Sequence, residues 1–220
     1  MRIELSPPVP GTTTWTPDDL HAWQILRPLL DAGGYLPWSS GTMRPLGLVE
    51  VCNDIVLGHR RRILELGSGT STILLARLLR GRGGHLDAIE HDPGWAAWVR
   101  NELEAEALAP WATVTHTPLQ PATSGTDQRP WYDAATVDAV TSGPPIDLLI
   151  VDGPPAYEPA DALSRLPALP VLIDRLAPNA VVILDDISRA GEQAVLTAWE
   201  EQTPFRFDRR DSGIALGRKP

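Results

Sequence analysis

Residues 63–72 read Ile-Leu-Glu-Leu-Gly-Ser-Gly-Thr-Ser-Thr, in which a short apolar run meets a turn with two glycines and then a helix-like stretch. This is the order expected of a buried strand, a tight turn and the start of a helix in an α/β protein. Gly67 and Gly69 allow backbone angles and a close approach that any side chain would prevent. Ligands of open α/β sheets bind at the carboxyl ends of the strands, so the turn after Leu66 is a candidate binding site.

The glycine turn alone leaves several interpretations open. A nicotinamide dinucleotide fingerprint requires Gly or Ala at the position that Thr72 holds, where helix and strand pack closely. A phosphate-binding loop of the nucleoside triphosphatase kind requires a Gly-Lys-Ser/Thr sequence, which does not follow here. A tight turn that binds no ligand is the simplest alternative.

Short aliphatic and β-branched runs alternate with longer stretches of helical periodicity along the chain, which is typical of βαβ units. We expect strands at Ile63–Leu66, His85–Glu90, Thr113–His116, Ile146–Val151, Ala180–Leu184, Phe205–Asp208 and Ile214–Leu216. We expect helices at Ser71–Leu79, Gly94–Leu108, Pro159–Leu176 and Gly191–Gln202, with two more at Asp18–Asp31 and near Arg44–Leu57. Three of the strands are continuous apolar runs, as expected where helices cover both faces of a parallel sheet.

We therefore predict a single α/β domain over residues 1–220, with a Rossmann-like, doubly wound, seven-stranded mixed sheet. Residues 1–58 are expected to form a helical N-terminal cap, and residues 59–220 the cofactor-binding α/β core. The short connection between the last two strands predicts an antiparallel hairpin at one edge of the sheet. The segment Pro118–Pro145 is rich in Pro, Thr, Gly and Ser and is predicted to be a flexible loop.

A carboxylate follows the glycine turn at the spacing expected of a ribose-binding acid. Glu90 ends the strand His85–Glu90, about 20 residues beyond the glycines, where a ribose is bound in dinucleotide-binding folds. Its carboxylate can accept hydrogen bonds from two neighbouring ribose hydroxyls. A solvated strand end is the alternative interpretation.

Together these motifs resemble the class I methyltransferase family over residues 61–216. The residues that carry the resemblance are Glu65-x-Gly67-x-Gly69, Glu90 in Glu-His-Asp-Pro, Asp152 in Val-Asp-Gly-Pro-Pro, and Asp185-Asp186. Within the family the pattern is most similar to small-molecule methyltransferases akin to catechol and sugar O-methyltransferases. The resemblance implies S-adenosylmethionine as cofactor and methyl transfer to a small molecule as the reaction.

The resemblance also implies which residues contact the cofactor. Those expected at its methionine end are Glu65, Gly67, Ser68, Gly69, Ser71 and Thr72. Glu90 would bind the ribose, and Asp152 completes the expected set. His91 would reach the adenosine or act as a base, with a partly buried structural histidine as the alternative. The family often has an acid after the third strand to bind the adenine amine; residues 116–120 contain none, and Leu119 is expected to pack on the ring.

Three acids, Asp152, Asp185 and Asp186, follow buried strands and are expected to converge at one edge of the sheet. Like charges this close raise at least one pKa unless a positive group intervenes. One resolution is a bound Mg²⁺ or Ca²⁺ that orients a substrate hydroxyl; the other is Asp152 acting without metal as general base. Metal-dependent O-methyltransferases often carry Asp-Asn where this chain has Asp185-Asp186. A helix cap for Asp186 and a turn-stabilising role for Asp152 are the structural alternatives.

Aromatic and apolar residues outside the predicted core strands are candidates for an apolar pocket over the cofactor's sulfonium, where aromatic rings favour a cation. The substrate-contacting candidates are Trp38, Met43, Trp131 and Tyr157. Core packing is the alternative for each of them. The expected reaction is O-methylation of a hydroxyl. N-methylation without metal, a non-catalytic adenosylmethionine-binding protein and a nicotinamide-dependent reductase are the alternatives.

Charge, cysteine content and the first residues of the sequence indicate which binding partners and which cellular compartment to expect. The formal net charge of −9 disfavours nucleic acid and membrane surfaces as partners, so a small-molecule substrate is expected. The first residues lack the basic start and apolar run of an export signal, and no apolar stretch is long enough to span a bilayer. The single cysteine, Cys52, cannot form an internal disulfide, which fits a cytoplasmic protein. A homo-oligomer is compatible with these features.

Overall fold

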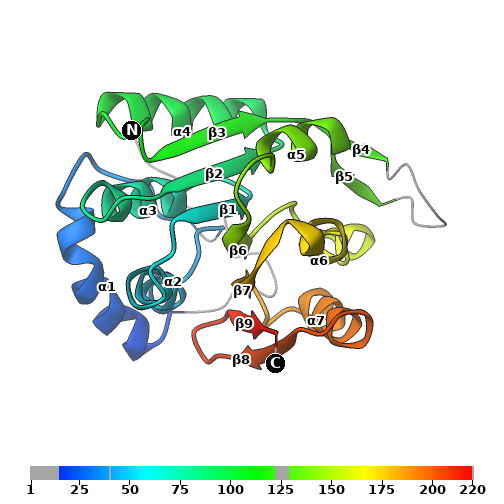
Figure 1. The fold of residues 1–220 in the computed structure, drawn as a ribbon. Coiled ribbons are helices and arrows are strands. Elements are labelled where there is room, and N and C mark those ends of the chain that lie inside the picture. The colour runs from blue at the N-terminus through cyan, green and yellow to red at the C-terminus, as the bar shows by residue number, and fades with distance from the viewer. Residues whose placement is uncertain (1–14, 40, 122–128, 220) are drawn as a thin grey trace.

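The computed structural model describes residues 15–39, 41–121 and 129–219, which form a twisted seven-stranded sheet with helices on both faces (Figure 1). The strands of this sheet are β1 (Arg62–Leu66), β2 (His85–Glu90), β3 (Ala112–His116), β6 (Ile146–Val151), β7 (Leu176–Leu184), β8 (Arg206–Arg209) and β9 (Ala215–Arg218). Their order is β3-β2-β1-β6-β7-β9-β8. All seven predicted strands are confirmed, and β7 is longer than expected because it begins at Leu176.

Neighbouring strands run parallel from β3 to β7, whereas β9 is antiparallel to both β7 and β8. The predicted doubly wound mixed sheet and its edge hairpin are thus confirmed. Both faces of the central strands are apolar: Leu148 and Ile150 belong to the core on one face, and Leu149 and Val151 to the core on the other. This double burial explains why the central strands are continuous apolar runs.

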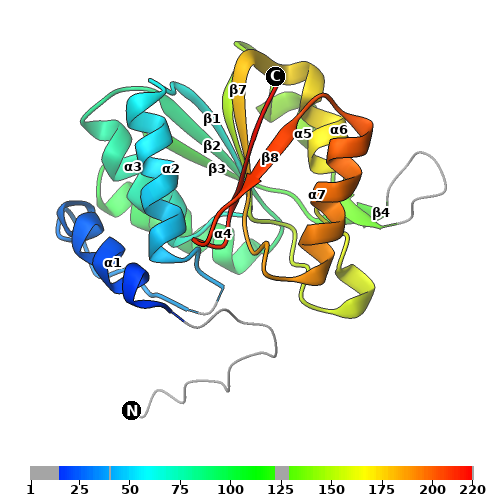
Figure 2. The same ribbon diagram turned by 90° about the horizontal axis from the view of Figure 1, so that it is seen from below.

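Seven α-helices occur in the described part of the chain: α1 (Pro17–Leu30), α2 (Pro45–Leu57), α3 (Thr70–Arg80), α4 (Pro93–Ala105), α5 (Ala134–Val140), α6 (Ala168–Leu172) and α7 (Ala190–Gln202). α2, α3 and α4 pack on one face of the sheet, and α5, α6 and α7 on the other (Figure 1). α1 lies outside this layer, against α2 and α3 (Figure 2). Within the described ranges, no helix has the length and apolarity that a membrane crossing requires.

α1 begins at a capping box, because the Thr16 side chain accepts a hydrogen bond from the Asp19 N–H while the Asp19 carboxylate accepts one from the Thr16 N–H. Asp19 is fully buried and also accepts hydrogen bonds from the guanidinium of Arg44. Arg44 in turn donates to the carbonyl of Asp211 at 2.9 Å, in the turn between β8 and β9. One buried ion pair therefore joins α1, the start of α2 and the edge hairpin.

The predicted helix Pro159–Leu176 is wrong. The segment contains only two single-turn 3₁₀ helices, at Pro159–Asp161 and Ile173–Arg175, and the short α6. Pro167 and Pro170 explain the difference, because a proline inside a helix lacks the N–H donor and clashes with the preceding turn. The apolar residues at helical spacing still enter the core, and these are Ala168, Leu169 and Leu172.

The prediction of a flexible loop at Pro118–Pro145 is wrong for the residues that the structure describes. A small hairpin of β4 (Leu119–Pro121) and β5 (Pro130–Tyr132) is followed by α5, and residues 122–128 lie outside the described part. Trp131, Tyr132 and Val137 are buried in the core that also holds α6 and α7. Their apolar burial stabilises a segment whose turn-forming composition indicates a loop.

The strand order reverses between β1 and β6, which are neighbours although β2 and β7 extend the sheet in opposite directions. Such a reversal leaves a crevice between the loops at the carboxyl ends of the two strands. The loop after β1 contains Gly67, and the loop after β6 contains Asp152. The fold therefore brings the predicted glycine turn and a predicted acid to one place.

Candidate functional site

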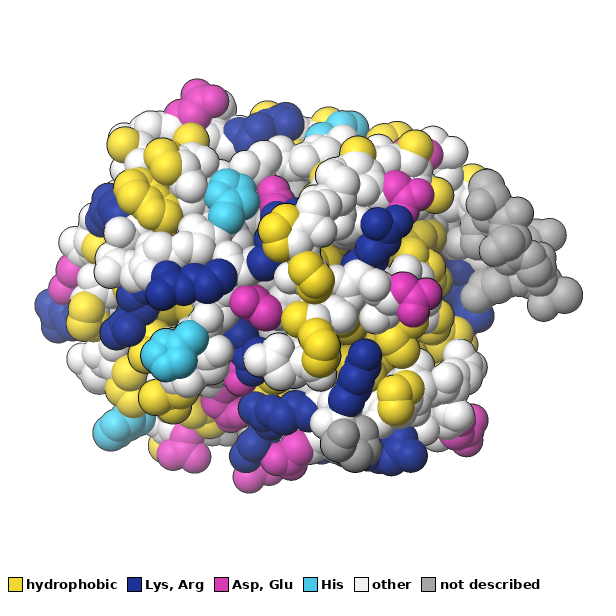
Figure 3. Space-filling view, in the orientation of Figure 1, with side chains coloured by type: hydrophobic (Ala, Val, Ile, Leu, Met, Phe, Trp, Pro, Cys, Tyr) yellow, Lys and Arg dark blue, Asp and Glu magenta, His cyan; other side chains and the backbone are white. Residues whose placement is uncertain are grey.

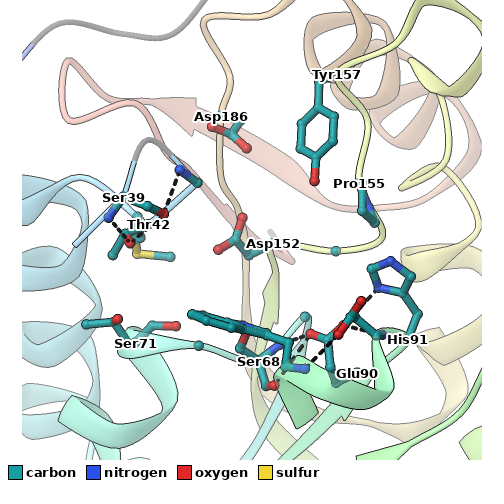
Figure 4. A pocket seen from close by; sticks show the side chains of 18 of the residues that line it. Ser39, Thr42, Ser68, Ser71, Glu90, His91, Asp152, Pro155, Tyr157 and Asp186 are labelled. Atoms are coloured by element: carbon teal, nitrogen blue, oxygen red, sulfur yellow. Dashed lines mark hydrogen bonds and ion pairs between the residues drawn. The ribbon is translucent and has the colours of Figure 1, made fainter. Parts of the chain in front are cut away.

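A cavity of about 400 Å³ lies at the carboxyl ends of β1, β2 and β6 (Figure 4), a size suited to a small molecule. The residues singled out from the sequence that line it are Met43, Gly67, Ser68, Gly69, Ser71, Glu90, His91, Asp152, Tyr157 and Asp186. Those that lie outside its lining are Trp38, Glu65, Thr72, Leu119, Trp131 and Asp185. The cavity thus gathers residues from segments that are far apart in the sequence.

The glycine turn brings two loop backbones into contact. Gly67 has a φ of 86°, and a Cβ there would lie 3.1 Å from the carbonyl carbon of Asp152 and 3.1 Å from the nitrogen of Gly153. The Asp152 N–H donates to the carbonyl of Leu66 at 2.9 Å. Only glycine combines this backbone angle with so close an approach, so the turn fixes the floor of the cavity.

Glu65 is fully buried behind the glycine turn. Its two carboxylate oxygens accept hydrogen bonds from the hydroxyls of Ser71 (2.6 Å) and Thr72 (2.5 Å), and the Thr72 hydroxyl accepts one from the N–H of Gly69 (2.9 Å). Burial raises the pKa of Glu65 to about 7, although the hydroxyl bonds act in the opposite direction. Glu65 and Thr72 therefore stabilise the turn from the side away from the cavity. At the position where a dinucleotide fingerprint has Gly or Ala, Thr72 links Glu65 to the Gly69 N–H.

Glu90 lies at the end of β2 with its carboxylate held from three sides (Figure 4). One oxygen accepts from the Ser68 N–H at 2.8 Å; the other accepts from the Asp92 N–H at 2.8 Å and pairs with Nδ1 of His91 at 2.8 Å. Burial raises the pKa of Glu90, but these partners outweigh it and leave the pKa below its ordinary value. The hydrogen bond to Glu90 in turn raises the pKa of His91. Glu90 is thus an ionised acceptor at the cavity, and His91 supports it.

Trp95 is a cavity residue that the sequence did not single out. It lies in the first turn of α4, stacks on Trp98 with ring centroids 4.6 Å apart, and donates from Nε1 to the carbonyl of Ser68 at 2.6 Å. Asp92 caps this helix by accepting from the Trp95 N–H at 2.6 Å. The short spacing between Glu90 and Trp95 is the signal that could have placed this ring beside the site.

The three acids converge as predicted: carboxylate oxygens of Asp152, Asp185 and Asp186 lie within 4.8 Å of one another. Burial, aided by the charge of Asp185, raises the pKa of Asp152 well above its ordinary value. Burial and the charge of Asp186 raise the pKa of Asp185 to about 7. Asp186 follows β7 with a φ of 62° and pairs with Arg189 at 2.8 Å.

Arg165 lies among these acids, and the sequence did not single it out. Its Nη2 is 3.0 Å from a carboxylate oxygen of Asp186 and 3.4 Å from one of Asp152. The side chain is 2% exposed, and the surrounding acids hold the pKa of Arg165 above its ordinary value although burial lowers it. The only signal for it in the sequence is that it is the first basic residue after Asp152.

The aromatic substrate candidates have different surroundings. Tyr157 lines the cavity, with the Arg189 guanidinium 5.6 Å from its ring centroid. Trp38 packs against Trp23 with centroids 4.6 Å apart, next to α1. Trp131 is buried beside Tyr132, on the strand that pairs with Leu119 and its neighbours in β4.

Comparisons with known proteins agree with this arrangement. A family model described as a methyltransferase domain matches residues 64–187. No curated protein matches the chain significantly. Cofactor-bound Rv0187 from MTB shares 20% identity at a TM-score of 0.64, covering 94% of this chain and 99% of that one. The SAH-bound methyltransferase PaMTH1 from Podospora anserina shares 14% identity at a TM-score of 0.64, covering 95% and 90%. An O-methyltransferase from Bacillus cereus in complex with SAH shares 16% identity at a TM-score of 0.59, covering 94% and 92%.

Proposed function

This chain belongs to the methyltransferase-domain family, and from that membership we propose that it transfers a methyl group from S-adenosylmethionine to a hydroxyl of a small molecule. The observation that carries the proposal is the cavity between the loops after β1 and β6, where the glycine turn meets the Glu90 carboxylate. A nicotinamide-dependent reductase is disfavoured by the same family membership. The SAH found in two of the similar structures supports the choice of cofactor.

The residues present fit this cofactor. Glu90 is ionised and faces the cavity, so its carboxylate can accept a hydrogen bond from a ribose hydroxyl. The backbone from Gly67 to Ser71 adjoins Glu90 in the cavity lining and offers a close approach to the methionine end. Glu65 and Thr72 contribute by holding that backbone in place.

When bound, S-adenosylmethionine supplies an electrophilic methyl group on a sulfonium. Asp152 lines the cavity and is assigned the role of general base: its carboxylate takes the proton from the acceptor hydroxyl as the O–C bond forms and the S–C bond breaks. The raised pKa of Asp152 makes its ionised form a stronger proton acceptor than an exposed aspartate. The remaining work of the site is to position the two reactants and to exclude water.

A small molecule fits the site better than a macromolecule. The cavity is about 400 Å³, and Met43 and Tyr157 are among its walls. The chain carries a net charge of −9, and basic and acidic side chains are intermingled on the face shown in Figure 3. A nucleic acid requires a continuous basic surface, which this face lacks.

Calorimetric titration with S-adenosylmethionine and S-adenosylhomocysteine tests the cofactor assignment. We expect Glu90→Gln to weaken both affinities about 10- to 100-fold, because a charged hydrogen-bond acceptor is lost. Glu201→Gln, which changes an exposed acid on α7, is the matched control and should bind as wild type does. No binding heat with either ligand would refute the assignment.

A panel of phenols, sugars and amines, assayed with labelled donor, tests the acceptor. Methylated phenols or sugars, lost in Asp152→Asn, support O-methylation with Asp152 as base. Methylated amines alone would replace it by N-methylation. Unchanged methyl transfer in Asp152→Asn would refute Asp152 as base, and donor binding with no methylated product would favour a non-catalytic binding protein.

A further inference from the structure

The acids at the carboxyl ends of β6 and β7 already have a positive partner within the protein. The Arg165 guanidinium lies within 3.0 Å of Asp186 and 3.4 Å of Asp152, and 3.6 Å from the buried carboxylate of Glu192. We propose that Arg165 takes the place of a divalent cation in this cluster, so that the site works without a bound metal ion. The inference extends the proposed methyl transfer, but the geometry behind it does not depend on the reaction.

Arg165 is held in place by the backbone as well as by the acids. It donates to the carbonyls of Asp152 (2.8 Å), Pro154 (3.2 Å) and Asp185 (3.1 Å), which belong to the loops after β6 and β7. A guanidinium has five donors in a fixed plane, and here they reach several acceptors at once. If the side chain left, these carbonyls and the neighbouring carboxylates would lose partners in a buried setting, which is costly. A metal ion therefore cannot enter simply by displacing Arg165.

Two of the carboxylate oxygens that a metal ion would need, one each from Asp152 and Asp186, also have a positive partner already. The same Asp186 oxygen that accepts from Arg165 lies 2.8 Å from Arg189, so two guanidinium groups share it. A divalent ion among these oxygens would lie close to both positive groups and be repelled by them. The trio of acids has suitable spacing for an ion, but with Arg165 and Arg189 in place it does not fit one.

Arg165 also lines the cavity, and its Nη2 lies 3.4 Å from a carboxylate oxygen of Asp152, the residue assigned as base for the acceptor hydroxyl. A positive group there favours the deprotonated form of a hydroxyl, which is one effect that a metal ion would otherwise supply. Arg165 also fixes the carboxylate of Asp152 through their hydrogen bond. We class it as a positioning residue that contributes the local positive charge.

Mn²⁺ titration followed by electron paramagnetic resonance tests the proposal without donor or acceptor, so its outcome is separate from that of the proposed reaction. Wild type should show no Mn²⁺ site that depends on Asp186 at millimolar Mn²⁺. Arg165→Met keeps the apolar stem and removes the charge, so it should gain one Mn²⁺ site, which Arg165→Met with Asp186→Asn should lose. Arg175→Met, at an arginine paired with Asp138 on the surface, should gain none.

Three results would overturn the proposal. The first is a Mn²⁺ site in wild type that Asp186→Asn removes, and the second is a folded Arg165→Met protein without a new site. The third is the loss of wild-type methyl transfer on chelation with EDTA, once an acceptor is known. If Arg165→Met does not fold, Arg165→Gln gives the same comparison. The Mn²⁺ titration and the EDTA test on wild type can each still refute the proposal.

Discussion

Among single side chains, Glu65 gives the clearest pH dependence. Burial raises its pKa from 4.5 to about 7, so between these values the folded protein keeps a proton that the unfolded chain has lost. The contribution of Glu65 to the free energy of unfolding is therefore full below pH 4.5 and is lost as the pH rises toward 7. We expect the difference in stability between wild type and Glu65→Gln to change by about 3 kcal/mol over this window.

Urea unfolding at a series of pH values measures this difference. Glu201→Gln serves as the control, because an exposed acid should leave the pH dependence as it is in wild type. Parallel pH profiles for wild type and Glu65→Gln would show that Glu65 titrates alike in the folded and unfolded states.

Gly67 allows a test of the close approach between the loops after β1 and β6. Gly143 also has a positive φ, of 107°, but a Cβ there would meet nothing within 4 Å. Gly143→Ala should therefore lower the free energy of unfolding only through backbone strain, by about 1 kcal/mol. Gly67→Ala adds a steric contact and should lower it by about 3 kcal/mol. Denaturant unfolding of both variants measures the costs, and equal values would argue against the tight contact.

The site could be predicted from the sequence where a residue ends a strand or lies within two residues of its end, because strand ends of a parallel sheet share one edge. Glu90, Asp152 and Asp186 are of this kind, and all three line the cavity. Arg165 could not be found this way, since it reaches the acids from an irregular segment whose path depends on tertiary packing. Trp131 also shows the limit, because its burial beside Tyr132 is set by the β4–β5 pairing and not by local pattern.

For whole elements, the contact that holds α1 can be tested through Arg44. This arginine pairs with the fully buried Asp19 and donates to the carbonyl of Asp211. Arg44→Met should leave a buried carboxylate without its partner and cost about 3 kcal/mol, with faster hydrogen exchange in α1. Arg27→Met, which breaks an exposed pair with Asp31 on the same helix, should cost less than about 1 kcal/mol.

A double-mutant cycle with Asp19→Asn separates the pair from its surroundings. The Asp19→Asn protein has no buried charge that needs a partner. Arg44→Met should therefore lower the free energy of unfolding much less in that protein than in wild type. Equal costs in the two proteins would mean that Arg44 acts only through its packing and its bond to Asp211.

Elements were predictable where periodicity and end signals agreed. The strands around Glu65 and Leu149 are apolar on both faces and bounded by polar turns, and helices such as α4 begin at an acid followed by proline. The helix predicted over residues 159–176 was wrong because the leucine spacing fits a helix, whereas Pro167 and Pro170 prevent a continuous one. For residues 119–121 and 130–140 the composition indicates a loop, but burial in the core outweighs it and they form strands and a helix.

In the molecule as a whole, the cavity lies where the two halves of the sheet meet, so cofactor binding should stabilise the entire fold. Its walls come from Ser39, residues 41–43, the loops after β1 and β2, and the loop after β6, which belong to both sides of the strand-order reversal. A ligand that binds only the folded state raises the free energy of unfolding by about 2.7 kcal/mol at 100 times its Kd. For a chain of this size each kcal/mol raises Tm by about 2–4 °C, so S-adenosylhomocysteine should raise Tm by about 5–10 °C.

Calorimetric melting with and without S-adenosylhomocysteine measures this shift in one cooperative transition. At the same ligand concentration Glu90→Gln should show a smaller shift, whereas Glu201→Gln should match wild type. NAD at equal concentration should produce no shift, because Thr72 stands where a dinucleotide fingerprint has Gly or Ala, and its hydroxyl there is bonded to Glu65 and to the Gly69 N–H. Equal stabilisation by NAD, or a transition that splits in two on binding, would contradict a cofactor site shared by both halves of the sheet.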